Sequence, residues 1–292
     1  QARGNLDYSA DKLRQKFYAS TATALCGMNG RYIEMDYQET QMYGDVMAMV
    51  KKQLNDFTLD VAIGGSINDR ITNSTRIDSK NASLKYANVF NLANIVMSSS
   101  ASIDQKIDAH YQLQSVFATA QIGYKEGVFL DLTARNDWSS TLAYTKYEKK
   151  GFFYPSVGVS FLPDKWVKMP EWVSFSKLRG AYSIVGNGVP PFITYPVSYV
   201  TAGGEILASD AAPFAEMKPE MTHSVELGME WKFLQHRLGL NLTYYRTDTY
   251  EQFFKLPALA GDKYAYRYVN AGDIRNQGWE ITLDATPVLT PD

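Results

Sequence analysis

The stretch Ser224-Val225-Glu226-Leu227-Gly228-Met229-Glu230-Trp231-Lys232 decides the fold class of this chain. Its odd positions are apolar and its even positions are polar or small, a period of two that is typical of a β-strand with two different faces. The segment 237–247 repeats the alternation with Leu238, Leu240 and Leu242. Comparable patterns mark expected strands at 56–65, 114–124, 127–137, 153–162, 176–186 and 275–285, and weaker ones near 12–21 and 31–40. The chain is therefore expected to be all-β, with about ten strands.

The polar faces of these strands mix small residues with charges of both signs. The charged members that we assign to one common face are Asp131, Arg135, Lys177, Arg179, Glu226 and Glu230. In a soluble β-sandwich such a face meets water, whereas in an outer-membrane barrel it lines a wet lumen while the apolar face meets lipid. Periodicity alone leaves both architectures open, so a secreted soluble β-sandwich that binds carbohydrate remains the alternative.

The lengths of the connections favour the barrel. Short turns are expected at 125–127, from Pro163 onward and at 233–236, and they alternate with long loops at about 138–152, 187–221 and 248–274. Short periplasmic turns that alternate with long extracellular loops are typical of a transmembrane antiparallel β-barrel. Loops of this length are rare in compact domains unless they carry function.

Aromatic residues are abundant and gather near the expected strand ends. The chain has 20 Tyr, 14 Phe and 5 Trp among its 292 residues. The rings flanking strand ends are Trp138, Tyr144, Tyr147, Phe152, Phe153 and Tyr154, then Tyr244, Tyr245, Tyr250, Phe253 and Phe254, with Trp166 and Trp172 beside a short turn. Two girdles of amphipathic rings at the lipid–water boundaries would produce this distribution.

Charge and motif content exclude several other functions. Lys and Arg total 29 against 31 for Asp and Glu, so the chain lacks the basic surplus that a non-specific nucleic-acid binder needs. The lone Cys26 and three unpaired histidines offer no metal-ligand spacing, and we expect no metal, no cofactor and no enzyme activity. Glu226 and Glu230 would lie about 13 Å apart on a strand, beyond the roughly 5–9.5 Å that glycosidase carboxylates use.

Several segments, in their order along the chain, resemble a known family. They are Thr133-Ala134-Arg135-Asn136-Asp137-Trp138-Ser139-Ser140-Thr141-Leu142, Tyr154-Pro155-Ser156-Val157-Gly158, Leu178-Arg179-Gly180-Ala181-Tyr182, Lys218-Pro219-Glu220, Asn270-Ala271-Gly272 and Asn276-Gln277-Gly278-Trp279-Glu280. Together they are similar to the barrel of SusC/RagA-type TonB-dependent transporters of Bacteroidota. The resemblance covers about 50–292 and is strongest over 112–286.

The resemblance implies a transporter in the outer membrane of a Gram-negative cell. Residues 1–292 would form part of one TonB-dependent receptor barrel domain, with the plug domain and the closing strands absent, because large barrels of this kind have about 22 strands. The implied function is energy-coupled uptake of a glycan or peptide nutrient. The implied partners are a SusD-like surface lipoprotein, TonB, which would act through the missing N-terminal region, and outer-membrane lipid.

Aromatic residues of the two longest loops are the candidate substrate contacts. They are Tyr195, Tyr199, Tyr250, Phe253, Phe254, Tyr264 and Tyr266. Ring faces with hydroxyl groups suit oligosaccharides or peptides, because they supply contact area at little side-chain entropy. The same loops have few cations, so we expect a neutral ligand, more readily an oligosaccharide than a peptide.

Overall fold

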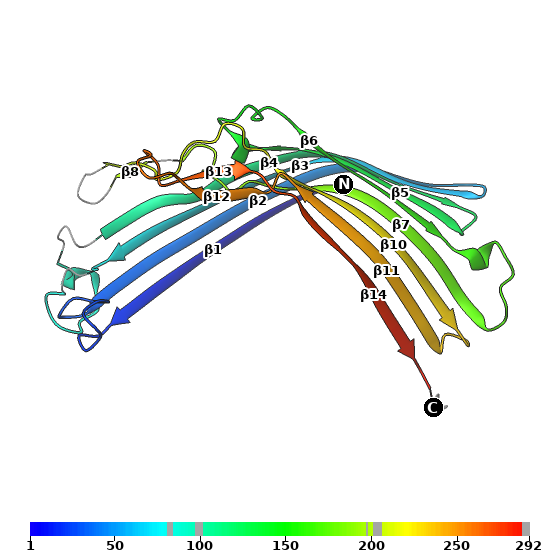
Figure 1. The fold of residues 1–292 in the computed structure, drawn as a ribbon, viewed down its shortest axis with the longest axis horizontal. Helices are drawn as coiled ribbons and strands as arrows, with labels where there is room; N and C mark the ends of the chain where they lie inside the picture. The colour runs from blue at the N-terminus through cyan, green and yellow to red at the C-terminus, as the bar shows by residue number, and fades with distance from the viewer. Residues whose placement is uncertain (81–83, 97–101, 197, 201–205, 288–292) are drawn as a thin grey trace.

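A single antiparallel sheet of ten strands dominates the computed structural model, which describes residues 1–80, 84–96, 102–196, 198–200 and 206–287. Its strands follow one another in chain order, and each pairs with the next: β1 (Ala2–Phe17), β2 (Arg31–Leu54), β3 (Phe57–Asp78), β4 (Ser102–Tyr124), β5 (Val128–Ser139), β6 (Phe152–Phe161), β7 (Val173–Asn187), β10 (Glu220–Phe233), β11 (Leu238–Tyr250) and β14 (Ile274–Ala285). The sheet is strongly curved, and within the described residues β1 and β14 remain its two free edges (Figure 1).

The remaining elements are small and belong to the connections. Two-stranded sheets form from β8 (Tyr199–Val200) with β9 (Ile206–Leu207), and from β12 (Phe253–Pro257) with β13 (Tyr266–Asn270). Three single turns of 3-10 helix are η1 (Leu92–Asn94), η2 (Ser140–Leu142) and η3 (Pro163–Lys165). Over the described ranges, no helix has the length and apolar character needed to cross a membrane.

The expected strands are confirmed, but four have bounds that differ from the expected ones by more than three residues. β1 starts at Ala2 and ends at Phe17, β2 continues to Leu54, β3 continues to Asp78, and β4 already begins at Ser102, so His110 lies inside a strand. Alternation marks a strand only where one face is apolar. Beyond residue 68, β3 is mostly polar on both faces, and Ile71 and Ile77 are too far apart to give its outer part a period of two.

Short and long connections alternate along the whole sheet, as expected. The short turns join β2 to β3, β4 to β5 and β10 to β11, while β6 and β7 are joined by the modest 162–172 segment that contains η3. Consecutive positive φ values at Lys125 and Glu126 give the tight β4–β5 turn the twist that adjoining strands require. The long loops gather at one end of the sheet and the short turns at the other (Figure 1).

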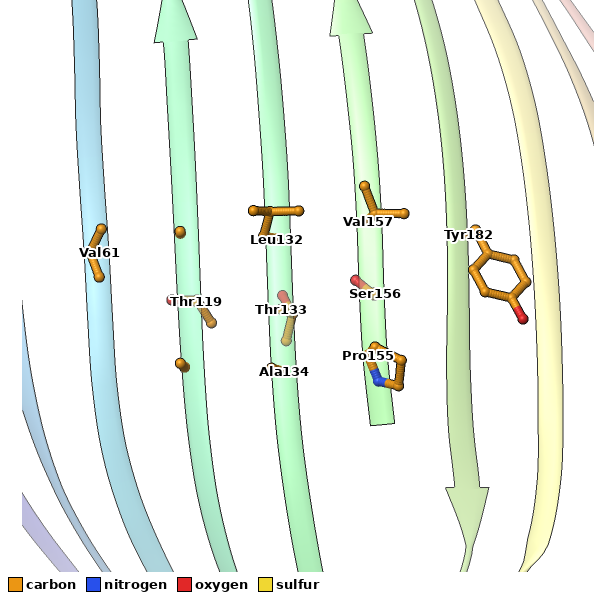
Figure 2. A pocket seen from close by; sticks show the side chains of 11 residues that line it. Val61, Thr119, Leu132, Thr133, Ala134, Pro155, Ser156, Val157 and Tyr182 are labelled. Carbon is orange, nitrogen blue, oxygen red and sulfur yellow. The ribbon is translucent and has the colours of Figure 1, made fainter. Parts of the chain in front are cut away.

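One face of the sheet, here called the apolar face, carries a continuous band near the short-turn end. On β3 the band runs through Phe57, Leu59, Val61, Ile63 and Ile67 and stops at Asp69. Cross-strand partners extend it, because Val61 pairs with Ala120, Ala120 with Leu132, and Leu132 with Val157. A shallow groove lies in this band, and Figure 2 shows side chains that line it from successive strands, among them Val61, Leu132, Val157 and Tyr182.

The band has the height that a bilayer requires. From Phe57 to Ile67 it spans 11 residues, which is the upper end of the 9–11 residues with which a tilted strand crosses the hydrocarbon core. Many of its side chains are exposed, including Ile63, Val116, Leu227, Ile281 and Leu283. An uncovered apolar surface of this size is unfavourable in water.

Aromatic rings mark both edges of the band. At the short-turn end, the ring of Tyr124 lies 4.7 Å from Phe57 and 5.5 Å from Trp166, measured between centroids, and Trp172 stacks on Phe233 at 5.6 Å. At the other edge, Tyr244 and Trp279 lie 5.0 Å apart. Rings are therefore present at both edges, but Tyr154 and Tyr245, two expected members of the long-loop girdle, lie on the polar face opposite Arg135 and Glu226. Tyr147 and Phe152 instead pack into a loop core.

The structure does not favour the alternative of a soluble β-sandwich. A β-sandwich buries its core between two sheets packed face to face. Among the described residues, the only other sheets are the two-stranded β8–β9 and β12–β13 pairs, and the apolar band of the large sheet stays exposed.

Candidate functional site

Charged and small residues fill the opposite face of the sheet, here called the polar face. In register, Arg179 of β7 lies beside Gly228 of β10, which lies beside Thr243 of β11. The guanidinium of Arg179 crosses Gly228 and donates through Nη2 to the hydroxyl of Thr243 at 2.7 Å. Its Nε donates to Glu226 at 3.2 Å, so one side chain ties three strands together on this face.

A second arginine connects β4 and β5 on the same face. Arg135 donates from Nε to Asp137 at 2.7 Å and from Nη2 to the hydroxyl of Ser115 at 2.8 Å. Asp131, further along β5, accepts a hydrogen bond of 2.7 Å from Gln121. These contacts orient the charges along the sheet, and the Arg135 side chain stays 41% exposed while Ser115 is buried.

The acidic pair expected on β10 is split between two partners. Glu226 bonds to Arg179, whereas Glu230 forms an ion pair of 3.4 Å with Lys232 on its own strand and lies opposite Lys177 in the register with β7. The two carboxylates therefore act as separate structural charges, which is unlike the paired acid and base of a hydrolase. In the described part of the chain, no group of three or more His, Cys, Asp or Glu is placed to hold a metal ion.

Three long loops merge into one packed unit above the polar face. Leu142 of η2, Val189 and Met217 form its buried centre. The partly buried side chains around that centre are Tyr147, Phe152, Ile193, Phe214, Phe253 and Tyr268. Burying these side chains stabilises a fixed loop arrangement, because each large apolar side chain contributes about 1.5–3 kcal/mol when fully buried.

Two polar residues anchor this loop unit to the sheet. Glu220, at the start of β10, accepts hydrogen bonds from the backbone N–H of Phe253 at 3.1 Å and from the amide of Asn187 at 3.2 Å. Asn270, at the end of β13, donates to the carbonyl oxygens of Lys218 and Glu251 and accepts from the N–H of Lys218. Our substrate-site prediction did not include either residue, although both lie in the segments that carry the family resemblance.

A separate loop pair covers the long-loop ends of β1 to β4. Tyr32, Leu84 and Ile95 form its buried centre. Below it, Asp78 is fully buried and accepts hydrogen bonds from Arg31 at 2.9 and 2.7 Å. Burial alone would raise the pKa of Asp78, but Arg31, the N–H of Lys80 and the charge of Arg76 lower it overall.

The predicted substrate residues do not share one surface. Tyr195 is exposed and lies 4.8 Å from Tyr144, ring to ring, whereas Phe253 packs inside the loop unit. Phe254 is exposed beside Gly272, and Tyr250 contacts His223. The side chain of Tyr199 lies outside the described residues.

Tyr264 and Tyr266 lie in the β12–β13 hairpin, each beneath a lysine. The ammonium of Lys255 is 3.5 Å from the centroid of Tyr266, and that of Lys263 is 5.3 Å from Tyr264. Other lysines of the long loops are also engaged, since Lys146 pairs with Glu216 and Lys218 with Glu251. These four lysines are thus engaged by neighbours within the loops, whereas among the described residues Arg267 and Lys149 form no ion pair.

A curved antiparallel sheet with an apolar band of bilayer height, aromatic edges and a charged opposite face defines a transmembrane β-barrel protein. The chain belongs to the family described as TonB dependent receptor-like, beta-barrel, whose model matches residues 1–290. The barrel is not closed by the strands present here.

Curated relatives come from Formosa agariphila. TonB-dependent receptor P26 is 26% identical over 192 residues, and TonB-dependent receptor P3 is 25% identical over 191 residues. Each match covers 62% of this chain and 19% of the relative. The chain therefore matches about a fifth of the length of these relatives.

Solved structures share the fold at low sequence identity. The RagAB peptide transporter matches 100% of this chain and 32% of its own chain, with a TM-score of 0.83 and 19% identity. The ferric enterobactin receptor PfeA matches 96% of this chain and 38% of its own, with a TM-score of 0.55 and 15% identity. At such low identities the structural similarity shows the fold of the sheet alone.

Proposed function

We propose that this chain is the barrel portion of an outer-membrane, TonB-dependent importer of an oligosaccharide or peptide nutrient. The observation that carries the proposal is the two-faced sheet. Its apolar band has bilayer height and aromatic edges, while its opposite face holds the ordered row of Arg179, Gly228 and Thr243. Such a sheet suits a wall between lipid and a wet lumen.

The loop unit would form the outer mouth of the importer. It is held by its own core and by Glu220 and Asn270, so its aromatic side chains have fixed positions. We propose a neutral ligand, because Lys146, Lys218, Lys255 and Lys263 of the loops are engaged by carboxylates or by tyrosine rings. A SusD-like surface lipoprotein and TonB are the proposed partners, and energy would come from outside the chain.

Uptake by cells tests the proposal directly. The complete gene product would be produced in a strain that lacks the gene, and accumulation of labelled neutral oligosaccharides and peptides would be measured. The double variant Tyr264→Ala/Tyr266→Ala should lower uptake, whereas Tyr86→Ala, an exposed tyrosine of the other loop cluster, should leave it unchanged. An epitope at the cell surface would report that all variants are equally abundant.

Two results would contradict the proposal. One is a gene product that does not fractionate with the outer membrane. The other is uptake of every substrate at the same rate with and without the gene. Loss of uptake in the tyrosine variant but full uptake in Tyr86→Ala would support the β12–β13 hairpin as part of the substrate path.

A further inference from the structure

The apolar face extends across β7, β10, β11 and β14, and on β11 and β14 it gives way to arginines toward the long loops. Four successive rows run across these strands in register. They are Leu178–Met229–Leu242–Ile281, then Gly180–Leu227–Tyr244–Trp279, then Tyr182–Val225–Arg246–Gln277, and finally Ile184–His223–Asp248–Arg275. On β11 and β14 the side chains change from aliphatic to aromatic and then to polar or charged within these four rows.

The lower rows form a groove on the apolar face. Its lining includes Leu178, Leu227, Met229, Leu242, Tyr244 and Trp279. Gly180 lies on the same face, and the absence of its Cβ atom, which would come within 3.3 Å of Leu227, leaves room between the larger side chains. The groove ends at the Tyr244–Trp279 ring pair, which lies at the edge of the band.

Two guanidinium groups lie directly beyond that ring pair. Arg246 follows Tyr244 by two residues, a distance of about 7 Å along the strand. Asp248 accepts from Nε of Arg246 at 2.8 Å and from Nε of Arg275 at 2.5 Å. Arg275 lowers the pKa of Asp248 most, and Arg246 adds to the effect, so the carboxylate stays ionised.

The contacts through Nε fix both side chains without using their terminal nitrogens. No described residue accepts a hydrogen bond from an Nη atom of Arg246 or Arg275. The side chains are 40% and 55% exposed, against 15% for Asp248. The triad therefore keeps one net positive charge and presents free planar donors, a geometry that matches phosphate oxygens.

This arrangement is local to one part of the sheet. At the corresponding step above the band on β3 and β4, Asp69 contacts Gln112 at 3.0 Å and His110 at 3.4 Å. That patch has a carboxylate and no lysine or arginine. A phosphate group would be repelled there and attracted to the Arg246–Arg275 pair.

We propose that the groove and the two arginines together bind one membrane lipid with an anionic phosphate headgroup. The acyl chains would lie along Leu178, Leu227 and Leu242, and the phosphate would accept hydrogen bonds from the free nitrogens of Arg246 and Arg275. The inference rests on the proposed membrane location of the apolar band. It adds a specific lipid site to that location, and the substrate path on the opposite face is not involved.

Native mass spectrometry of the complete gene product in nanodiscs tests the site. The discs would contain phosphatidylcholine alone or a mixture with phosphatidylglycerol, and the phosphatidylglycerol that stays bound during gas-phase release would be counted. The double variant Arg246→Gln/Arg275→Gln should retain at least roughly tenfold less, since each arginine near an anionic surface contributes on the order of 1 kcal/mol, or about fivefold. Added inorganic phosphate should displace little, because it lacks the acyl chains.

The matched control is Arg237→Gln in the short turn of the same β10–β11 hairpin. Its guanidinium donates to the carbonyl oxygens of Thr286 and Pro287, at the opposite end of the strands. This variant should retain phosphatidylglycerol like the unaltered protein. Equal retention in the double variant and the unaltered protein would overturn the lipid site alone. Failure of the unaltered protein to enter nanodiscs would overturn the proposed membrane location and the site with it.

Discussion

The guanidinium of Arg179 lies flat over Gly228, where a Cβ atom would come within 2.6 Å of its Nε. The glycine is the middle member of the row that joins β7 to β11, so the arginine can reach Thr243 only by crossing it. The alternation pattern marks Gly228 only as a small residue on the polar face. The structure shows that the hydrogen bond from Arg179 to Thr243, which spans three strands, requires a glycine at this position.

Gly228→Ala should lower the free energy of unfolding by about 1–2 kcal/mol, because it displaces a side chain with two charge-assisted hydrogen bonds. Gly239→Ala is the control. It lies on the same hairpin, and its added Cβ would meet Asp284 at an ordinary 3.5 Å. Urea unfolding of the complete gene product in lipid vesicles measures both. Equal effects would show that the crossing contributes nothing.

An introduced charge should lower the free energy of unfolding much more on the apolar face of β11 than on its polar face. Leu240 lies in the apolar band, paired with Trp231 and Leu283, whereas its neighbour Asn241 is on the polar face opposite Glu230. Leu240→Arg should cost about 2–4 kcal/mol near the bilayer midplane, and Asn241→Arg much less. The same vesicle unfolding assay compares them, and similar losses would mean that the faces are wrongly assigned.

Alternation in the sequence predicted these faces because one side of each strand must be apolar to meet lipid while the other is polar. On the apolar face, Val225 and Leu227 lie opposite Arg246 and Tyr244. On the polar face, Glu226 lies opposite Tyr245, so successive residues of β10 alternate between the faces. The strand assignment of the outer half of β3 could not be predicted from alternation, since both faces of that half are mostly polar.

Contacts between loops were also beyond prediction from patterning. Phe253 and Tyr250 lie three residues apart, yet one packs inside the loop unit and the other contacts His223. Their different surroundings follow from strand pairing, because Tyr250 ends β11, which pairs with β10, whereas Phe253 begins β12, which pairs with β13. The part played by Gly228 likewise depends on register, which no single strand reveals.

A protease site inserted at Gly261 should be cleaved on intact cells, whereas one inserted at Gln235 should be cleaved only after the cells are opened. Gly261 is between β12 and β13 with a φ of 93° and no atom within 4 Å of its Cβ position, so an insertion meets little resistance. Gln235 is in a short turn at the other end of the sheet. The reverse accessibility would invert the proposed orientation.

Low pH should loosen the long-loop ends of β1 and β2. Glu34 is hydrogen-bonded by Lys12 at 2.7 Å, Tyr32 at 2.6 Å and Arg14 at 3.2 Å, and these contacts, with Lys12 first, lower its pKa from 4.5 to about 2. A depressed folded-state pKa gives stability that is present above pH 4.5 and lost as the pH falls toward 2.

Hydrogen exchange of the β1–β2 amides, corrected for intrinsic rates, measures this loss. Protection near Glu34 should fall between pH 5 and pH 2.5 in the unaltered protein. In Glu34→Gln it should be lower at neutral pH and nearly flat with pH. The same slope in both proteins would assign the pH dependence to another group.

Ligand binding by the complete gene product should be nearly independent of salt. Lys146 and Lys218 pair with glutamates, and Lys255 and Lys263 lie over tyrosine rings, so a ligand in the loop unit would meet rings and hydrogen-bonding groups more than free charge. Screening acts on exposed charges over a Debye length of about 8 Å at physiological ionic strength, and it leaves ring stacking unchanged. Isothermal titration with the substrate that uptake assays identify, at low and at high salt, should give dissociation constants that agree within about twofold. A steep fall in affinity with salt would identify a charged ligand, because only charge pairing is lost in this way, and the proposed neutral substrate would then be wrong.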